Sequence, residues 1–245
     1  MTDQPVLILG GRSDIGLAIA HRYADLGHTV QLAARNAQSL SQEKTDMELR
    51  YGVTVSLHDF DVLAPDTHEA FLDGLPALPQ IAVCAVGYMG DQAESQRDPA
   101  AATLVMRSNF EGPANILALL ANLFEARGSG TLIGISSVAG DRGRATNYVY
   151  GAAKAGFTAF LSGLRNRLAG RGVHVLTVLP GFVATRMTEG LDLPEKLTTD
   201  PETLAVAVAR AAEKRRNVIY VKGVWAVVML VIRNIPEAIF KKLSI

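Results

Sequence analysis

The chain is poor in cysteine, and its charges cancel. Cys84 is the one cysteine among 245 residues, which excludes an internal disulfide framework. The 24 Lys and Arg side chains equal the 24 Asp and Glu side chains in number and are scattered, so charge gives no case for nucleic-acid binding. The N-terminal residues enter an apolar strand without the charged and apolar regions of a secretion signal. These absences predict a cytoplasmic protein.

Long apolar runs are also missing. The C-terminal run at residues 224–232 has nine apolar residues, whereas a membrane-spanning helix needs about 20. Residues 233–243 mix Arg and Lys with apolar side chains and predict an amphipathic helix. Three interpretations of residues 223–245 stay open: a lid over a binding pocket, an oligomer contact, or peripheral attachment to a lipid surface.

Apolar strands alternate with helical segments along the whole chain. Hydrophobic residues make up 49% of it, which is enough for a large core. No shift in composition, repeat or low-complexity segment marks a second domain, so residues 1–245 predict one domain. The alternation predicts an α/β fold, a doubly wound and mostly parallel sheet of about seven strands with helices on both faces. Ligands of such sheets bind at the carboxyl ends of the strands.

Tyr150 and Lys154 lie four residues apart in a predicted helix, and therefore on one face of it. A nearby ammonium stabilises a phenolate, so we expect Lys154 to lower the Tyr150 pKa from its ordinary value of about 10. Such a phenol can donate a proton near neutral pH, as carbonyl reduction requires. The Tyr150 and Lys154 pair alone is weak evidence for catalysis, because many Tyr and Lys pairs at this spacing lie on solvent-exposed helix faces.

Ser137 is the first partner that strengthens this interpretation. It follows the apolar run 131–135, which predicts a buried parallel strand. A hydroxyl at the end of such a strand can polarise a substrate carbonyl. Ser136 is better suited to a structural hydrogen bond in the turn.

Asn109 is the second partner, in a segment of about residues 99–126 that predicts one long helix. Pro113 has no N–H, so the Asn109 carbonyl loses its helical donor and the helix should kink there. The free carbonyl oxygen could hold a water near Lys154 and complete a proton route from solvent to Tyr150. The alternative is that Pro113 merely bends the helix to fit the sheet.

A glycine-rich turn at residues 10–16 joins a short apolar strand, residues 5–9, to a helical run, residues 17–26. Glycine allows the backbone to approach a pyrophosphate, and the following helix N-terminus favours its charge. We therefore expect cofactor contacts from Gly10, Arg12, Ser13, Asp14, Ile15 and Gly16. A carboxylate would repel a pyrophosphate, so we expect Asp14 to act as a helix N-cap and turn away from it.

These motifs together resemble the short-chain dehydrogenase/reductase family, whose active site contains Asn, Ser, Tyr and Lys, with a Ser thirteen residues before the Tyr. Ser137 and Tyr150 keep that interval. The resemblance covers nearly the whole chain and implies a Rossmann-type fold. It implies the catalytic residues Asn109, Ser137, Tyr150 and Lys154. It adds cofactor contacts at Asp61, Val62, Ala85, Gly87, Tyr150, Lys154, Pro180, Gly181, Val183 and Thr185.

The chain departs from the family pattern at two sites. In the first turn, Leu9 and Asp14 replace a Thr and a Gly. After the strand at residues 81–84, where the family has Asn-Asn-Ala-Gly, only Gly87 is kept. We therefore expect backbone contacts alone to the cofactor from this second loop.

The charge at the end of the second strand predicts the cofactor. An acidic residue here would bind the ribose hydroxyl of NAD, but Ala34 takes that place and Arg35 follows it. With Arg12 from the first turn, two guanidiniums suit a 2′-phosphate, so we predict NADP(H). The alternative is that Arg35 is a solvated cation.

The predicted function is hydride transfer between NADP(H) and a carbonyl or secondary alcohol. The C-terminal segment and the start of the chain are similar to the branch of decaprenylphosphoryl-2-keto-erythro-pentose reductases, which implies a bulky or lipid-linked substrate such as a keto sugar or ketoacyl chain. A non-catalytic NADP(H)-binding sensor or scaffold is the alternative. The resemblance implies a homodimer or homotetramer, and we assign no residue to a metal site.

Overall fold

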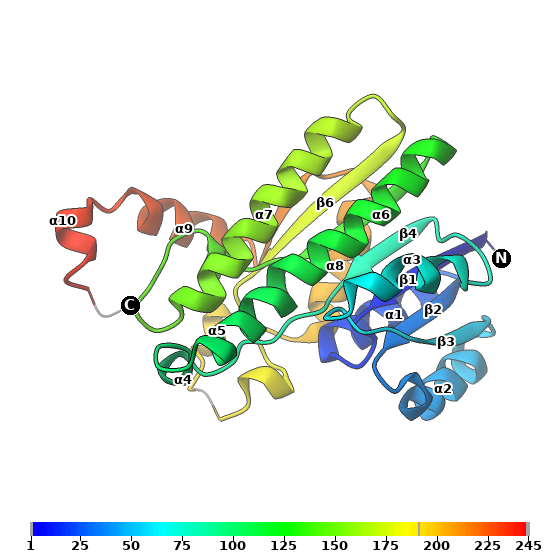
Figure 1. The fold of residues 1–245 in the computed structure, drawn as a ribbon, viewed down its shortest axis with the longest axis horizontal. Helices are drawn as coiled ribbons and strands as arrows, with labels where there is room; N and C mark the ends of the chain where they lie inside the picture. The colour runs from blue at the N-terminus through cyan, green and yellow to red at the C-terminus, as the bar shows by residue number, and fades with distance from the viewer. Residues whose placement is uncertain (1, 191, 244–245) are drawn as a thin grey trace.

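The computed structural model describes residues 2–190 and 192–243, and in them a seven-stranded parallel sheet lies between two layers of helices (Figure 1). The strand order is β3-β2-β1-β4-β5-β6-β9. Every neighbouring pair is parallel. The strands are β1 (Thr2–Leu9), β2 (His28–Ala34), β3 (Val55–Asp59), β4 (Ile81–Cys84), β5 (Gly130–Ile135), β6 (Val173–Pro180) and β9 (Val218–Val221). The predicted doubly wound α/β fold is confirmed.

Helices follow most strands, as the alternation predicted. They are α1 (Asp14–Asp25), α2 (Ser41–Tyr51), α3 (His68–Asp73), α4 (Gln92–Ser95), α5 (Pro99–Met106), α6 (Gly112–Arg127), α7 (Tyr148–Leu168), α8 (Pro201–Glu213), α9 (Val224–Asn234) and α10 (Glu237–Phe240). Short 3-10 turns lie at η1 (Ala37–Leu40), η2 (Pro65–Thr67), η4 (Val138–Gly140), η5 (Arg186–Thr188) and η6 (Glu195–Leu197). A small parallel pair, β7 (Phe182–Val183) and β8 (Thr198–Thr199), lies beside the main sheet.

Each face of the sheet has its own core, because successive side chains of a strand point to opposite faces. In β1, Val6 and Ile8 belong to the core shared with α1 and α8, whereas Leu7 and Leu9 belong to the core shared with α6 and α7. Burial on both faces explains why the strands are nearly continuous apolar runs. Strands β1 to β3 are added in one direction along the sheet and strands β4, β5, β6 and β9 in the other, and a crevice forms at the carboxyl ends of the strands where this order reverses, between β1 and β4.

The segment predicted as one long helix is helical throughout but irregular in the middle. Five residues between α5 and α6 form a π-helix, η3 (Arg107–Glu111). The irregularity lies where Pro113 removes a helical N–H, and π-turns occur where the regular ladder is interrupted. Gly112 is required by packing, because a Cβ there would lie 2.2 Å from the carbonyl oxygen of Val62.

The amphipathic helix predicted for residues 233–243 is wrong in its extent. Helix α9 continues to Asn234 and stops at Ile235, and only the four residues of α10 are helical beyond it. Pro236 explains the break, because a proline disfavours helical conformation in the residue before it and Ile235 is extended. The described residues contain no helix that is both long enough and apolar enough to cross a membrane.

Arg142 holds this C-terminal segment against the body of the protein. Its guanidinium donates to the carbonyl oxygens of Ile232, Arg233 and Ile235 at 2.7 to 3.1 Å. It also pairs with Glu237 at 2.7 Å and lies 3.9 Å from the centre of the Phe240 ring. The C-terminal segment is thus joined to the loop that precedes α7.

Candidate active site

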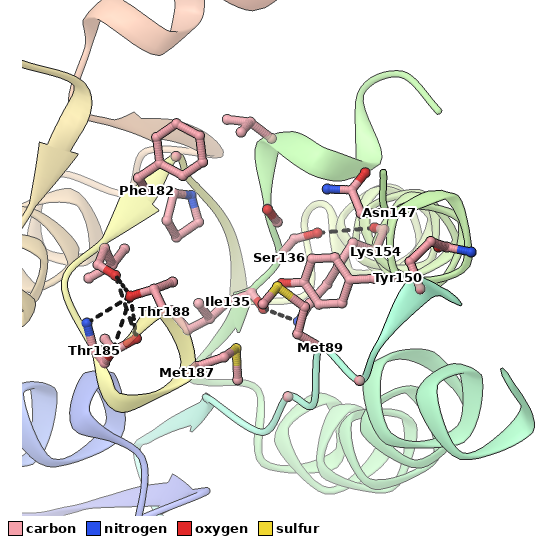
Figure 2. A pocket seen from close by; sticks show the side chains of 18 of the residues that line it. Met89, Ile135, Ser136, Asn147, Tyr150, Lys154, Phe182, Thr185, Met187 and Thr188 are labelled. Atoms are coloured by element: carbon pink, nitrogen blue, oxygen red, sulfur yellow. Dashed lines mark hydrogen bonds between the residues drawn. The ribbon is translucent and has the colours of Figure 1, made fainter. Parts of the chain in front are cut away.

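A cavity of about 480 Å³ opens at the carboxyl ends of β4, β5 and β6. Figure 2 shows Tyr150 and Lys154 on one side of it and Phe182, Thr185 and Met187 on the other. Of the predicted site residues, the cavity lining contains Ile15, Ala85, Gly87, Ser137, Tyr150, Lys154, Pro180, Gly181, Val183 and Thr185. The fold therefore brings together residues that lie up to 170 positions apart, from Ile15 to Thr185.

Ser137 and Tyr150 both line the cavity, and the Ser137 side chain lowers the Tyr150 pKa against the effect of burial. Ser137 follows β5 and its hydroxyl also accepts from the backbone N–H of Ala139 at 3.1 Å, which holds the turn. Ser136 has the structural role expected of it, because its hydroxyl donates to the Lys154 carbonyl oxygen at 3.0 Å. A carbonyl oxygen in the cavity could thus meet two hydroxyls at once.

The expected effect of Lys154 on the Tyr150 pKa is wrong in this structure. Burial raises the pKa of Tyr150 to about 12, and only the Ser137 side chain acts in the opposite direction. The Lys154 ammonium lies 5.7 Å from the centre of the Tyr150 ring and donates instead to the Ile135 carbonyl oxygen at 3.1 Å. Burial also lowers the pKa of Lys154 to about 8. Desolvation disfavours both charged forms, and it outweighs the attraction expected between them.

Asn109 is fully buried and fastens the loop that follows β4. Its amide nitrogen donates to the carbonyl oxygens of Tyr88 at 2.6 Å and Val105 at 2.9 Å, and its Oδ1 accepts from the Tyr88 N–H at 3.3 Å. A Cβ at Gly87 would lie 3.2 Å from Asn109 Oδ1 and 3.6 Å from Lys154 Nζ. Gly87 therefore lies close to both side chains, while the water proposed for the Asn109 carbonyl stays a prediction.

The glycine-rich turn has the close packing expected of a phosphate cradle. Gly10 has a φ of +91°, and a Cβ there would lie 2.9 Å from the carbonyl carbon of Ala85. A Cβ at Gly16 would lie 2.4 Å from the Gly10 carbonyl oxygen. The backbone of α1 begins directly after the turn, so its free N–H groups face the crevice where an anion would bind.

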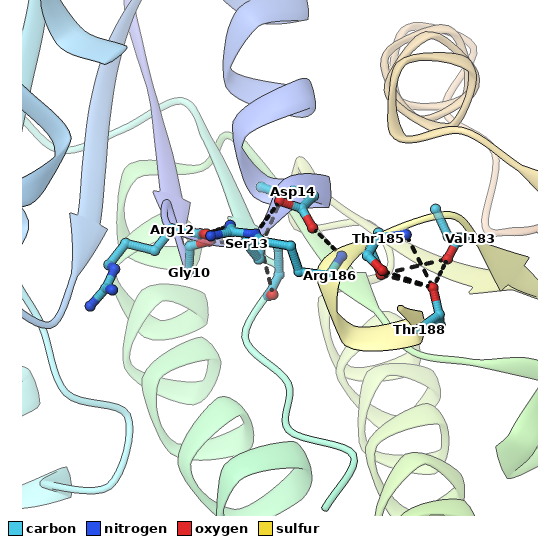
Figure 3. A network of polar contacts seen from close by, with 10 residues as sticks. Gly10, Arg12, Ser13, Asp14, Val183, Thr185, Arg186 and Thr188 are labelled. Atoms are coloured by element: carbon cyan, nitrogen blue, oxygen red, sulfur yellow. Dashed lines mark hydrogen bonds and ion pairs between the residues drawn. The ribbon is translucent and has the colours of Figure 1, made fainter. Parts of the chain in front are cut away.

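The helix cap expected at Asp14 is wrong, because Ser13 caps α1 by accepting from the Gly16 N–H at 3.0 Å. The Asp14 carboxylate instead accepts from the backbone N–H and the Nε of Arg186, each at 2.8 Å (Figure 3). Arg186 also donates to the Arg12 carbonyl oxygen at 2.6 Å. The negative charge in the turn is thus paired. Sequence reasoning missed Arg186, although an acid in an anion-binding turn was a signal to look for a cation.

Arg12 and Arg35 lie together at the carboxyl end of β2. The guanidinium of Arg12 lies 3.5 Å from the Arg35 carbonyl oxygen, and both side chains are exposed. Asp61 and Val62 follow β3 at the same edge of the sheet. Asp61 accepts from the Leu63 N–H at 3.0 Å, and Val62 is buried.

The loop after β6 is held by the C-terminal helix. A Cβ at Gly181 would lie 1.9 Å from Trp225 Nε1, and this indole nitrogen donates to the Leu197 carbonyl oxygen at 3.0 Å. Thr185 begins η5 and its N–H donates to the Thr188 hydroxyl at 3.1 Å. Sequence reasoning missed several lining residues, namely Met89, Gln92, Arg144, Asn147, Phe182, Met187 and Trp225. They lie on α4, β7, η5 and α9 and on loops, and Trp225 belongs to the segment 223–245, for which a lid over the pocket was one interpretation.

Comparison with known proteins agrees with this geometry. The family model described as short chain dehydrogenase matches residues 4–196. The chain is 37% identical over 242 residues to an uncharacterized oxidoreductase of Mycobacterium tuberculosis, covering 98% of this chain and 96% of that protein. It is 36% identical over 244 residues to an uncharacterized oxidoreductase of Streptomyces coelicolor, covering 98% and 96%.

A solved structure gives the same result for the fold. A short-chain dehydrogenase from Sphingobium yanoikuyae, in complex with NADPH, superposes with a TM-score of 0.82 at 24% identity and covers 96% of this chain and 97% of that one. The family model, the relatives and the fold agree over most of the chain. The chain therefore belongs to the short-chain dehydrogenase/reductase family and is an oxidoreductase.

Proposed function

We propose that the protein transfers a hydride between NADP(H) and a carbonyl or secondary alcohol. The observation that carries the proposal is that Ser137, Tyr150 and the buried Lys154 together line one cavity of about 480 Å³. A protein that only binds the cofactor would not need Ser137, Tyr150 and Lys154 in one site. A nicotinamide cofactor fits the site, because the tight turn through Gly10 and Gly16 leads directly into the N-terminus of α1, where backbone N–H groups favour an anion.

The chain's own groups account for binding and proton transfer. NADPH, when bound, supplies the hydride. The hydroxyls of Ser137 and Tyr150 hold and polarise the substrate carbonyl oxygen. Tyr150 is protonated at neutral pH, since its pKa is about 12, and donates its proton to that oxygen. Lys154, buried beside Tyr150, would bind a ribose hydroxyl of the cofactor and take part in the proton route proposed through Asn109.

The remaining lining supports a bulky, partly apolar substrate. Met89, Val149, Phe182, Met187 and Trp225 contribute apolar surface around the reacting groups. Trp225 comes from α9, so the C-terminal segment forms part of the wall, in keeping with its interpretation as a lid. Sites of this volume bury most of a drug-sized ligand. Lipid-linked keto sugars and ketoacyl chains are candidate substrates of this kind.

The cofactor choice gives a first test. Arg35→Ala is expected to reduce the preference for NADPH over NADH by about ten- to a hundred-fold, because a hydrogen bond to a charged group contributes about 1.5–3 kcal/mol. The measurement is the Kd of each nucleotide by nicotinamide fluorescence, followed by NADPH oxidation with a panel of ketones. Arg210→Ala, an exposed arginine on α8, is the matched control. An unchanged preference for NADPH in Arg35→Ala would refute the NADP(H) assignment. If the unmodified protein binds NADPH tightly but turns over no substrate, the sensor alternative would be supported.

The pairing of Asp14 with Arg186 gives a second test. Arg186→Ala leaves the Asp14 carboxylate unpaired beside the expected pyrophosphate, so we expect the Kd for NADPH to rise about fivefold, or about 1 kcal/mol for a largely exposed ion pair. Asp14→Asn removes the repulsion, and the double variant should return within about twofold of the original Kd. If the double variant binds as weakly as Arg186→Ala, Arg186 acts on the cofactor directly and not through Asp14.

We also propose a homodimer or homotetramer built on α5, α6 and α7. Large apolar side chains are partly exposed on the first two helices and the turn between them, at Leu104, Met106, Phe110 and Leu123. On α7, Gly156 lies against the Phe110 ring, where a Cβ would be 3.4 Å from the ring carbons. Small residues on α7 allow a second copy to approach closely.

A further inference from the structure

One wall of the cavity contains three buried polar atoms without a hydrogen-bond partner. They are Nε2 of Gln92, Nε of Arg144 and Oδ1 of Asn147, and all three residues line the cavity. Figure 2 shows Asn147 on the same side of the cavity as Tyr150 and Lys154. Native proteins rarely leave such atoms unpaired, and each case requires an explanation. Three in one cavity wall point to groups of a ligand.

The local structure keeps these atoms free. Gln92 Oε1 accepts from the Val149 N–H at 3.1 Å, which fixes the amide and leaves its nitrogen available as a donor. Asn147 takes the N-cap position of α7, yet its side chain makes no capping hydrogen bond. Its backbone groups are both used: the N–H donates to the Arg144 carbonyl oxygen at 3.1 Å, and the carbonyl oxygen accepts from the Gly151 N–H at 2.7 Å. The side-chain oxygen of an N-cap asparagine normally accepts a hydrogen bond from the first turn of its helix, and the Asn147 oxygen does not.

Arg144 is the charged residue of the cavity lining whose side chain forms no hydrogen bond or ion pair with the described residues. The other two charged lining residues are engaged, since Asp91 accepts from the Glu94 N–H at 2.7 Å and Lys154 donates to Ile135. Burial lowers the pKa of Arg144, yet an arginine stays protonated at neutral pH. A partly buried cation of this kind favours an anion in the cavity.

We propose that the substrate carries an oxyanionic group, a carboxylate or a phosphate, which Arg144 and Gln92 bind, and a hydroxyl that donates to Asn147. The guanidinium offers a planar pair of donors that matches an oxyanion, and the Gln92 amide adds a third. This inference rests on the proposed function and narrows it to the anionic members of the carbonyl class. The apolar lining at Met89, Phe182 and Trp225 then contacts the rest of the substrate.

The position of Arg144 next to the anchor of the C-terminal segment fits this role. Two residues earlier, Arg142 is fully engaged with the carbonyl oxygens at the end of α9 and with Glu237. These hydrogen bonds and this ion pair hold the loop before α7 in place. The backbone that carries Arg144 is therefore held in place by the contacts of Arg142.

The test compares matched substrates that differ in charge alone. A long-chain keto acid is measured against its methyl ester, and a keto sugar phosphate against the free keto sugar, by NADPH oxidation. We expect the anionic member of one pair to have the higher kcat/KM. Arg144→Met should lower kcat/KM for that member by about ten- to a hundred-fold, mainly through KM, and leave its neutral counterpart within about twofold. The pair that responds identifies the oxyanion as carboxylate or phosphate.

The controls separate recognition from folding. Arg144→Lys keeps the charge without the planar fork and should give an intermediate loss. Arg97→Met, an exposed arginine between α4 and α5, should behave as the unmodified protein does. The Kd for NADPH and the Tm of Arg144→Met report whether the variant is intact. Equal loss on anionic and neutral substrates, or no loss on either, would overturn the inference while the proposed function stands. Turnover of no carbonyl by the unmodified protein would overturn both.

Discussion

Tyr150→Phe is expected to lower kcat for carbonyl reduction by about a hundred- to ten-thousand-fold, the usual contribution of a positioned proton donor. The substitution removes one oxygen atom from a partly buried side chain that lies beside Ser137 and Lys154 in the cavity lining. The phenyl ring still fills the same space, so the packing of α7 should be kept. Because the lost group donates to the developing alkoxide, the loss should appear in kcat and kcat/KM alike.

The Kd for NADPH serves as the internal control for this variant and should stay within about threefold, since the phenol supplies only one contact among many. Tyr148→Phe is the matched control, because Tyr148 begins the same helix but is 45% exposed. Turnover that survives in Tyr150→Phe would show that another group protonates the substrate, and the mechanism would be wrong.

Lys154→Met is expected to abolish turnover and at the same time stabilise the fold. Burial lowers the Lys154 pKa from 10.5 to about 8, so at pH 7 the folded state carries a charge at a cost of about 3 kcal/mol. Methionine has a similar length and no charge. Part of the gain is lost because the Ile135 carbonyl oxygen loses its donor. We expect a net rise of about 2 kcal/mol in the free energy of unfolding, measured with urea at pH 7.

The stability difference between Lys154→Met and the unmodified protein should depend on pH in a predictable direction. Between pH 8 and 10.5 the unfolded chain keeps its lysine proton longer than the folded chain does, so stability rises with pH in that window. The contribution of Lys154 is about 1 kcal/mol between pH 8 and 9. Above pH 9 the raised pKa of Cys84, about 11, acts in the opposite direction. The advantage of Lys154→Met should therefore shrink by about 1 kcal/mol from pH 8 to pH 9, and a constant difference would contradict a buried, charged Lys154.

The sequence was sufficient for those features that depend on short spacings. The apolar runs predicted the main strands because both faces of a parallel sheet are buried. Tyr150 and Lys154 were found together because four residues make about one helical turn. Gly10 and Gly16 were found because close backbone approach requires glycine in a turn. In each case the signal lies within a few residues of the chain.

Features that depend on tertiary contacts were not predictable in this way. Arg186 lies 172 residues after the Asp14 carboxylate that it binds. Trp225 reaches Gly181 only because α9 folds back over the end of β6. The direction of the Tyr150 pKa depends on how deeply the ring is buried, and spacing along a helix carries no information on depth. Arg144 has no motif at all, and its significance comes from the partner that it lacks.

The π-helix at Arg107–Glu111 makes this part of the chain sensitive to insertions and deletions. A π-turn holds one residue more than the α-helix that it interrupts. Removing a single residue here would restore a regular helix and rotate everything beyond it by about 100°. Either Asn109 would leave Tyr88, or the buried face of α6, with Leu117, Leu120 and Phe124, would turn out of the core. In related sequences the length of this segment should therefore vary less than its composition, since substitution can be absorbed locally and a change of length cannot.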